Sequence, residues 1–494
     1  MSPPASAEPD LRAGCRGVVP LTARLEAWQR ELCRDPVQLS RWLDRHGSPL
    51  NVIDPSPLAG HARELTDVAA AAATDLKVFF ARKANKALAL VDEARRLGLG
   101  VDVASERELA QTLARDVSPS DIVVTAAVKP VALLERCVAS GATVVIDNED
   151  ELHALHAVTE QAGARVPVAL RLAPELGDGV RPTRFGLRAS ELLDVVDRLL
   201  PAGDAAPLTV SGVHFHLDGY DAGERIAALR QSLALIDALR DRGHAPTFVD
   251  IGGGIPMSYL DDKDEWERFW TAHRAALLGD REPLTLDGHG LGLTVHAGLI
   301  SGRANVYPSF QRPVRGAWLT QILRACADAA GTDATLAEGL RARGLQLRCE
   351  PGRSLVDGCG LTAARVQFRK RRRDGTWLIG VAMNRTQCRS AADDFLMDPL
   401  LLRVADWAPA GAHAAPTGPI EGYLVGAYCI ERELLTWRRL RFADGVAVGD
   451  IVVFPNTAGY QMHILESASH QIPLARNLIV RPGHAPVLDL IDTS

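Results

Sequence analysis

One of only six lysines in the chain, Lys83, directly follows the apolar stretch "VFFAR" at 78–82. Burying an ammonium group is expensive. Lys83 therefore either extends its charged end to solvent or is needed as an amine, since an amine in a mostly apolar site has a lowered pKa and is a usable nucleophile. Lys83 alone does not distinguish these two interpretations.

Three further short motifs combine residue types that bind or polarise a ligand. "HFH" at 214–216 supplies flat rings, "GGG" at 252–254 offers backbone amides that can approach a phosphate closely, and "EPGR" at 350–353 pairs an acid with a base. Taken singly, these motifs are also typical of a structural histidine pair, a tight turn and an ion pair across a turn. A shared location is what would favour a binding site.

The order of predicted strands and helices provides that shared location. Eight short apolar segments alternate with amphipathic helical stretches, which predicts an α/β fold with a closed TIM (β/α)8 barrel. The segments are 78–82, 100–105, 121–126, 143–147, 167–173, 210–217, 247–254 and 345–352. Functional groups of such a barrel lie at the carboxyl ends of its strands. The sequence places there Lys83, Asp102, Ser105, Arg171, His214, His216, Gly252, Gly253, Gly254, Glu350, Gly352 and Arg353.

A lysine, a carboxylate, a glycine turn with a nearby arginine and a flat ring together form a pocket for an anionic aromatic aldehyde, and pyridoxal phosphate is such a ligand. In their order and spacing, "FARKAN", "GVDVASERE", "GVHFHLDG", "DIGGG", "CEPGR", "GAYCIERE" and "NTAGY" resemble one known family. These are the alanine-racemase-fold (fold-type III) pyridoxal-phosphate decarboxylases of diaminopimelate, ornithine and arginine. The resemblance covers most of 50–365 and returns in 420–480.

The resemblance implies a role for each residue of the rim. Lys83 would bond covalently to the aldehyde of the cofactor, Glu350 would hold a proton on its pyridine nitrogen, and His216 would stack on its ring. The further cofactor contacts implied are Asp102 and Arg171 beside the lysine and the ring, and Gly252, Gly253, Gly254, Gly352, Arg353 and Tyr460 around the phosphate.

The resemblance also implies a lyase that releases CO2 from an amino acid. Cys429 would come from the β domain of a partner subunit and protonate the α-carbon after CO2 has left. The active site would then require a homodimer with shared active sites. The amino acid is either free or tethered to a carrier.

The sequence departs from the family at positions that touch the substrate. The amine-specific members carry Asp or Glu directly after the catalytic cysteine, whereas this chain has Ile430 and keeps an acid at Glu433. Asp218 replaces a glycine of the family's "HxGS" motif and is a candidate partner of a substrate amine. Arg389, in a loop similar to the family's substrate loop, is a candidate clamp for a carboxylate. We therefore expect an atypical substrate, not diaminopimelate or ornithine.

Two other functions stay open from the sequence alone. One is an amino-acid racemase or epimerase on the same barrel, which would protonate without losing CO2. The other is a catalytically inactive, decarboxylase-like binding or regulatory protein. The presence of both Lys83 and Cys429 favours the decarboxylase over the inactive protein.

The pattern of elements predicts a domain on either side of the barrel. Residues 1–49 are expected to form an extension partly packed on the β domain, 50–360 the barrel with a long insertion at about 258–343, and 361–494 an all-β, Greek-key or sandwich-like domain. The basic run "RKRRR" at 369–373 precedes "DGTW", which predicts the tip of a hairpin rather than a targeting signal.

Composition excludes several classes of function. A net charge of -6 argues against a nucleic-acid surface. No stretch approaches the roughly 20 apolar residues of a membrane span, and the N-terminus lacks an apolar signal region. Eight scattered cysteines fit reduced thiols in a cytoplasm rather than disulfides or a zinc site, so no metal is expected.

Overall fold

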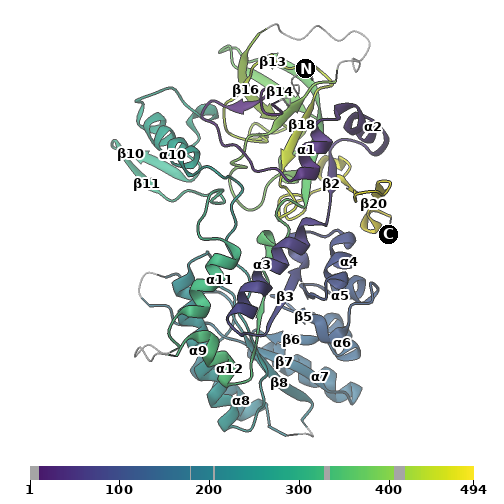
Figure 1. The fold of residues 1–494 in the computed structure, drawn as a ribbon, viewed down its shortest axis with the longest axis vertical. Coiled ribbons are helices and arrows are strands. Elements are labelled where there is room, and N and C mark those ends of the chain that lie inside the picture. Colours follow the sequence, from purple (N-terminus) through teal and green to yellow (C-terminus); the bar gives the residue numbers. More distant parts are fainter. Residues whose placement is uncertain (1–9, 178–179, 204–205, 328–333, 405–417, 494) are drawn as a thin grey trace, which may run out of the picture. The chain divides into compact units, whose positions relative to one another are not determined.

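The eight predicted strands close into a parallel barrel, which confirms the predicted TIM-barrel fold (Figure 1). The computed structural model describes residues 10–177, 180–203, 206–327, 334–404 and 418–493. Around the barrel the strands are β12 (Gln346–Cys349), β3 (Leu76–Ala81), β4 (Gly100–Val103), β5 (Ile122–Val124), β6 (Thr143–Ile146), β7 (Val166–Arg171), β8 (Leu208–His214) and β9 (Phe248–Asp250).

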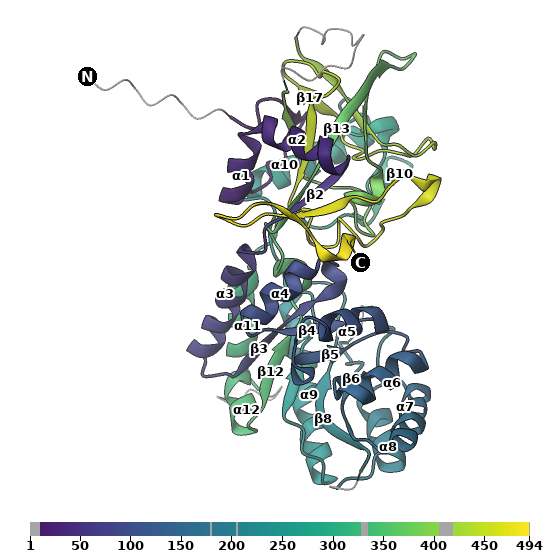
Figure 2. The ribbon, with the colours of Figure 1, turned by 90° about the vertical axis from the view of Figure 1, so that its right-hand side faces the viewer.

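Helices cover the outside of the barrel (Figure 2). Several begin at a residue whose side chain accepts a hydrogen bond from a backbone N–H of the first turn, as Ser105, Asn148 and Asp221 do. The helices of this unit are α3 (Pro57–Ala71), α4 (Leu88–Arg96), α5 (Glu106–Leu113), α6 (Val131–Ser140), α7 (Glu149–Ala162), α8 (Ala189–Leu199), α9 (Ala222–Asp241), α11 (Arg315–Arg324) and α12 (Leu336–Ala342).

The register of the barrel brings functional side chains to one level. Arg171 pairs with His214 across β7 and β8, and His214 pairs with Asp250 across β8 and β9. A buried apolar cluster fills the barrel interior with residues of five strands, which are Phe79, Val123, Val145, Ala169 and Phe248. These bulky side chains keep the interior closed, so that polar groups gather at the carboxyl ends of the strands.

The chain divides into two compact units at boundaries that differ from the expected ones. One unit comprises Ser56–Pro256 and Arg312–Val356, and the other comprises Met1–Pro55, Met257–Gln311 and Asp357–Ser494, of which residues 1–9 lie outside the described part. The segment 258–343, expected as one insertion, therefore splits at 311. Its second part supplies α11 and α12, which are helices of the barrel.

The second unit is built on a ten-stranded sheet, so the expected all-β domain is present. Residues 10–55 belong to it, because β1 pairs with β17 and β2 pairs with β13. Its strands are β1 (Arg16–Gly17), β2 (Leu50–Ile53), β13 (Gly360–Arg371), β14 (Trp377–Val381), β15 (Leu400–Leu402), β16 (Ile420–Val425), β17 (Leu440–Phe442), β18 (Ile451–Pro455), β19 (Arg476–Ile479) and β20 (Val487–Leu488).

The basic run 369–373 lies where β13 turns into β14, as predicted. The Arg372 N–H donates to the Thr376 carbonyl at 2.8 Å, and Gly375 adopts a positive φ of 87° that closes the turn. The basic run is thus the tip of a hairpin.

Two short helices, α1 (Ala27–Cys33) and α2 (Pro36–His46), share a buried cluster with strands of this sheet.

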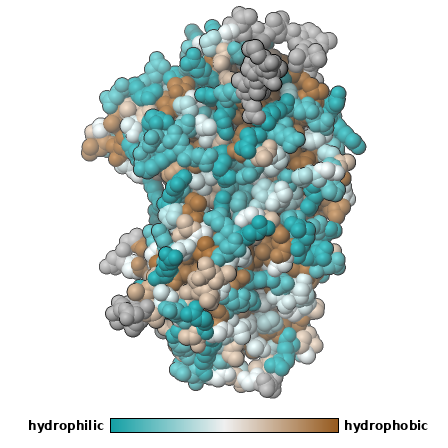
Figure 3. Space-filling model, in the orientation of Figure 1, coloured by the Kyte–Doolittle hydropathy of each residue, from teal (hydrophilic) through white to brown (hydrophobic). Residues whose placement is uncertain are grey.

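Residues 257–311, the first part of the segment expected as an insertion, belong to the β unit. They contain α10 (Lys263–Leu278) and a hairpin of β10 (Leu293–His296) and β11 (Leu299–Gly302). Figure 3 shows apolar surface at this hairpin, where Val295 is 39% and Leu299 73% exposed.

Among the described helices, none has the length and hydropathy of a membrane span.

Candidate active site

Lys83 lies immediately after β3, in the short 3-10 helix η1 (Arg82–Ala84). Its Nζ donates to Asp102 Oδ2 at 2.8 Å and is 3.6 Å from Glu350 Oε2. The lysine side chain is 33% exposed, whereas both carboxylates are 1% exposed. Two buried carboxylates, both placed on this rim by the sequence, therefore lie next to the amine.

Asp102 stands at the carboxyl end of β4 and connects the lysine to β5. Its other carboxylate oxygen accepts a hydrogen bond from the Thr125 hydroxyl. Burial raises the pKa of Asp102, and the neighbouring Glu350 adds to this shift while Lys83 opposes it. Ser105, placed on the rim by sequence, instead caps α5 by accepting from the Glu108 N–H at 3.2 Å.

A line of hydrogen bonds holds the acid of "EPGR" in place. Asp147 Oδ1 accepts from Arg171 Nη1 at 2.9 Å, Arg171 Nε lies 3.2 Å from His214 Nδ1, and His214 Nε2 lies 3.2 Å from Glu350 Oε1. An arginine can only donate, so Nδ1 of His214 accepts. The proton of the neutral ring is then on Nε2, which donates to Glu350.

His214 is neutral for a further reason. Burial lowers its pKa well below the usual histidine range, and the Arg171 guanidinium reinforces this effect. Asp147 also accepts from the Gly186 N–H at 3.1 Å, which anchors the loop carrying Phe185 to the same network. The network therefore reaches from a rim loop to the buried acid without any exposed charge in between.

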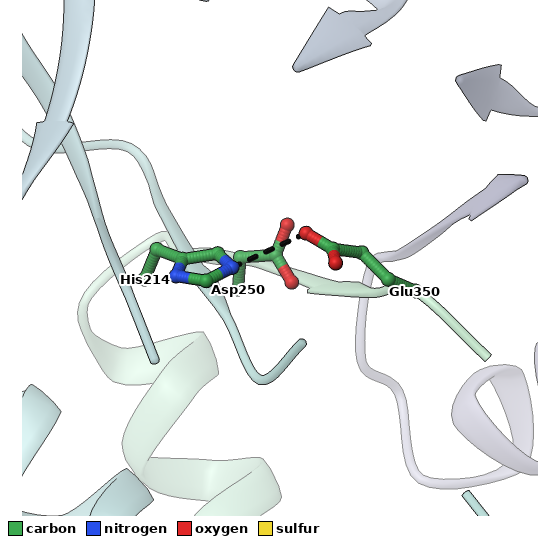
Figure 4. A group of neighbouring side chains, drawn as sticks. All are labelled: His214, Asp250 and Glu350. Carbon is green, nitrogen blue, oxygen red and sulfur yellow. Dashed lines mark hydrogen bonds and ion pairs between the residues drawn. The ribbon is translucent and has the colours of Figure 1, made fainter. Parts of the chain in front are cut away.

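Figure 4 shows the neighbouring side chains of His214, Asp250 and Glu350, whose polar atoms lie within 4.8 Å of one another. Histidine and carboxylates at this spacing can hold a metal ion. Nε2 of His214, however, carries the proton donated to Glu350, so it has no lone pair with which to bind a metal. Burial raises the pKa of Asp250 well above its usual range, with Glu350 adding to the shift. Glu350 Oε2 and Asp250 Oδ2 are both buried and find no hydrogen-bond partner in the described part of the chain.

The glycine turn after β9 is tied to this acid. Gly252 and Gly254 have positive φ values of 64° and 78°, and a Cβ on Gly252 would lie 2.5 Å from the Phe215 carbonyl oxygen. The Glu350 N–H donates to the Gly252 carbonyl at 2.9 Å. The turn requires glycine at both positions and leaves its backbone close to any group bound on the rim.

His216 lies in the loop after β8, not on the strand as predicted, because β8 ends at His214. Burial, with Lys83 contributing, lowers the pKa of His216 to about 3. Its Nδ1 accepts from the Gly253 N–H at 3.4 Å, and its ring meets Phe185 edge-on at 6.1 Å. A neutral flat ring held in this way suits stacking on an aromatic ligand.

Two other predicted cofactor residues, Gly352 and Arg353, lie in the short 3-10 helix η4 (Gly352–Ser354) that follows Glu350 and Pro351. Gly352 has a positive φ of 57°. Asp218 is exposed on the loop after β8. The structure thus assembles Lys83, Asp102, Arg171, His216, the glycine turn and the "EPGR" segment within the barrel unit.

The remaining predicted residues belong to the β unit. Cys429 is exposed, and Ile430 beside it is 47% exposed. Arg389 is only 6% exposed and donates to the Leu434 carbonyl. Glu433 is 3% exposed and accepts from the Arg385 N–H at 2.8 Å.

Tyr460, the predicted phosphate partner from "NTAGY", adopts a left-handed φ of 67° in the β unit. A non-glycine residue in this conformation is uncommon and is typical of a turn.

In the β unit, Arg389 and Glu433 are engaged with backbone groups, whereas the side chains of Cys429 and Ile430 reach the surface.

Sequence reasoning missed three members of the network. Asp250 ends β9, Asp147 directly follows β6 and Thr125 directly follows β5, which was a usable signal. His214 was placed on the rim but given no role. Their function depends on which strands are neighbours and in what register, and a single sequence does not report this.

Comparison with known proteins agrees with this geometry. Residues 60–278 match the family model described as pyridoxal-dependent decarboxylase, pyridoxal binding domain. An uncharacterised protein of Sinorhizobium fredii, y4yA, is 30% identical over 442 residues, which are 89% of each chain. The chain belongs to the pyridoxal-dependent decarboxylase family.

Characterised members are more distant. The diaminopimelate decarboxylase of Pseudomonas aeruginosa is 26% identical over 390 residues, covering 77% of this chain and 78% of that one. The crystal structure of a diaminopimelate decarboxylase from Helicobacter pylori, complexed with L-lysine, superposes with a TM-score of 0.63 at 17% identity, covering 91% of this chain and 95% of that one. The latter likeness shows a shared fold.

Residues of the barrel rim fit the cofactor of this decarboxylase family. Glu350 Oε2 is buried and accepts no hydrogen bond within the described residues, and the protonated pyridine nitrogen of pyridoxal phosphate is a suitable donor. The left-handed glycine turn provides the close backbone approach that a phosphate group requires. The family relationship supports a pyridoxal-phosphate-dependent amino-acid decarboxylase, and the lysine beside two carboxylates fits that cofactor.

Proposed function

We propose that Lys83 holds the cofactor and that the enzyme decarboxylates an amino acid without a distal ammonium group. One observation carries the proposal: the Lys83 amine lies 2.8 Å from Asp102 and 3.6 Å from Glu350 at the carboxyl end of the barrel. A lysine placed only to reach solvent would not be held between two buried acids.

Bound pyridoxal phosphate would accept the electron pair left on the α-carbon when CO2 departs. The chain's own residues prepare this step. Glu350 is oriented by the His214 N–H and keeps one oxygen, 3.6 Å from the Lys83 amine, without a hydrogen bond. Asp102 accepts from Lys83 and fixes the direction of its amine. His216 remains neutral near pH 7 and can cover a ring face.

The substrate proposal is supported by Ile430. The amine-specific relatives pair a substrate cation with an acid at this position, and an isoleucine that is 47% exposed offers only apolar surface. The nearest predicted acid, Glu433, is buried and accepts a backbone N–H instead. These two features favour an uncharged substrate side chain over that of diaminopimelate, lysine or ornithine.

The protonation proposal is supported by Cys429, which is exposed next to Ile430. We propose that this thiol, contributed by the β unit of a partner subunit, protonates the α-carbon after CO2 has left. A functional homodimer follows from this proposal. Because a thiol exchanges its proton readily near neutral pH, it is a suitable acid for this step.

The test combines a spectrum and a substrate panel. Purified protein supplied with pyridoxal phosphate is expected to absorb above 400 nm, and Lys83→Ala to lose this band. Lys77→Ala, at the other end of the same strand, is the matched control and retains it. A Lys83→Ala protein with an unchanged band would refute the assignment.

CO2 release is then measured over a panel of amino acids with apolar, polar, acidic and basic side chains. Highest activity with basic amino acids would contradict the substrate proposal, and α-deuterium exchange without CO2 would indicate a racemase. Cys429→Ala is expected to retain CO2 release but to slow protonation of the α-carbon about 100-fold. Cys326→Ala, which removes another exposed thiol, serves as the control.

A further inference from the structure

The loop "HLDG" at 216–219 presents an electrostatic problem for a phosphate site. It carries Asp218 where the resembling family has a glycine, and Gly219 where that family has a hydroxyl. A carboxylate next to a phosphate is repulsive, and a lost hydroxyl removes a donor. The structure contains a cation beside this loop that the family motifs do not include.

That cation is Arg225, in the first turns of α9. Its side chain is 0% exposed, and its Nη2 donates to the Leu217 carbonyl at 2.9 Å and to the Gly219 carbonyl at 2.7 Å. A Cβ built on Gly254 would lie 2.2 Å from the same Nη2. Arg225 therefore packs directly against the last glycine of the turn and also binds the "HLDG" loop.

The guanidinium is not fully satisfied by the protein. Nε and Nη1 are buried and have no hydrogen-bond partner within the described ranges. The nearest carboxylate, Glu224, is 3.6 Å from Nη1 and is itself 26% exposed. Unpaired donors on a buried charge are costly unless a strong acceptor is present for part of the working cycle.

Resting on the proposed cofactor site, we propose that Arg225 is a phosphate-recognition residue that offsets Asp218 and replaces the missing hydroxyl. It lies between the two loops that flank the phosphate position, and it carries the charge that a phosphate dianion requires. Asp218, Asp221 and Glu224 all act on this guanidinium electrostatically. One buried cation therefore serves both the acidic loop and the ligand.

The test compares two ligands that differ only in the phosphate. Apo-protein is titrated with pyridoxal phosphate and with pyridoxal. The dissociation constant of pyridoxal divided by that of pyridoxal phosphate measures phosphate recognition. Arg225→Met is expected to reduce this ratio by about 10- to 100-fold, the worth of one or two charged hydrogen bonds. Arg225→Lys is expected to restore part of it, because it keeps the charge.

A purely structural role gives a different result. If Arg225 only fixes the loops, Arg225→Met will weaken both ligands equally and leave the ratio unchanged, which overturns the proposal. Arg230→Met, on the same helix with one hydrogen bond to the Cys326 carbonyl, is the matched control and leaves the ratio unchanged. Wild-type protein that binds neither ligand would instead refute the cofactor site itself.

A second variant keeps the proposal testable if Arg225→Met fails to fold. Asp218→Gly removes the opposing carboxylate, so it is expected to tighten pyridoxal phosphate about 3- to 10-fold and to leave pyridoxal unchanged. Equal affinities of Asp218→Gly and wild type for pyridoxal phosphate would show that Asp218 does not oppose phosphate binding, which overturns the proposal that Arg225 compensates for it.

Discussion

Two lysines of the same barrel are held by carboxylates in opposite ways. Lys129 has a side chain that is 0% exposed, and its Nζ donates to the Ala126 carbonyl at 2.8 Å and to both Glu151 oxygens at 2.9 and 3.0 Å. All three of its N–H groups are used. Lys83, at 33% exposure, lies beside two acids, one of which has an oxygen that accepts no hydrogen bond within the described residues.

This difference separates structural from chemical use of one residue type. At Lys129, burial lowers the pKa of the lysine and raises that of Glu151, while mutual attraction opposes both shifts. The pair is complete without any ligand. Near Lys83, Glu350 Oε2 accepts no hydrogen bond within the described residues and meets the amine only at 3.6 Å, so it can still accept from a bound ligand. Unsatisfied groups, rather than buried charge as such, mark the functional lysine.

The largest expected effect tests the completeness of the Lys129 pair. Lys129→Met leaves Glu151 buried without its cation, so the free energy of unfolding is expected to fall by about 3–5 kcal/mol in urea titrations. Lys129→Met/Glu151→Leu is expected to recover most of the loss. Lys83→Met is expected to cost less, because Asp102 keeps the Thr125 hydroxyl and Glu350 keeps the His214 N–H as donors. The reverse order for the two lysines would break the comparison.

The next effect concerns the orientation of Glu350. His214→Phe removes the N–H that Glu350 accepts, so kcat is expected to fall about 100-fold through misplacement of the acid, with a smaller change in KM. His156→Phe, on α7, which loses a histidine hydrogen bond to the Leu199 carbonyl of α8, is the control. Unchanged kcat in His214→Phe would show that the hydrogen-bond line has no catalytic role.

A smaller effect follows from the pKa of about 3 at His216. Between pH 3 and 6.5 the unfolded chain binds more protons at this histidine than the folded chain, so its contribution to stability is present above pH 6.5 and is lost as pH falls. From pH 6.5 to 5 the wild-type apo-protein is expected to lose about 1.5 kcal/mol more than His216→Phe. Parallel stability curves for the two proteins would contradict the burial of this ring.

The smallest expected effect concerns Ser105, which was placed on the rim by sequence but caps a helix in the structure. Ser105→Ala removes a helix cap from α5, so stability is expected to fall by about 1 kcal/mol while cofactor absorbance and kcat stay unchanged. Thermal unfolding and the 400–430 nm band measure the two quantities. A loss of absorbance would place Ser105 in the site after all.

The sequence could predict every barrel strand, because strand–helix alternation is a local signal. It also located Lys83, the glycine turn and Glu350, since each follows a strand and the carboxyl ends of barrel strands meet. It also named both acids around Lys83, Asp102 and Glu350, but not the hydrogen bonds that orient them. Arg225 escaped notice because its side chain reaches back from a helix to a loop, and only coordinates reveal that direction.

The path of the chain has a consequence for how this protein can be produced in pieces. The backbone passes from one unit to the other after residues 55, 256, 311 and 356, so neither unit is encoded by a single uninterrupted stretch. The barrel lacks β12 until translation has passed residue 349. No single truncation yields an intact half, and reconstitution from fragments would need at least one unit assembled from separate polypeptides.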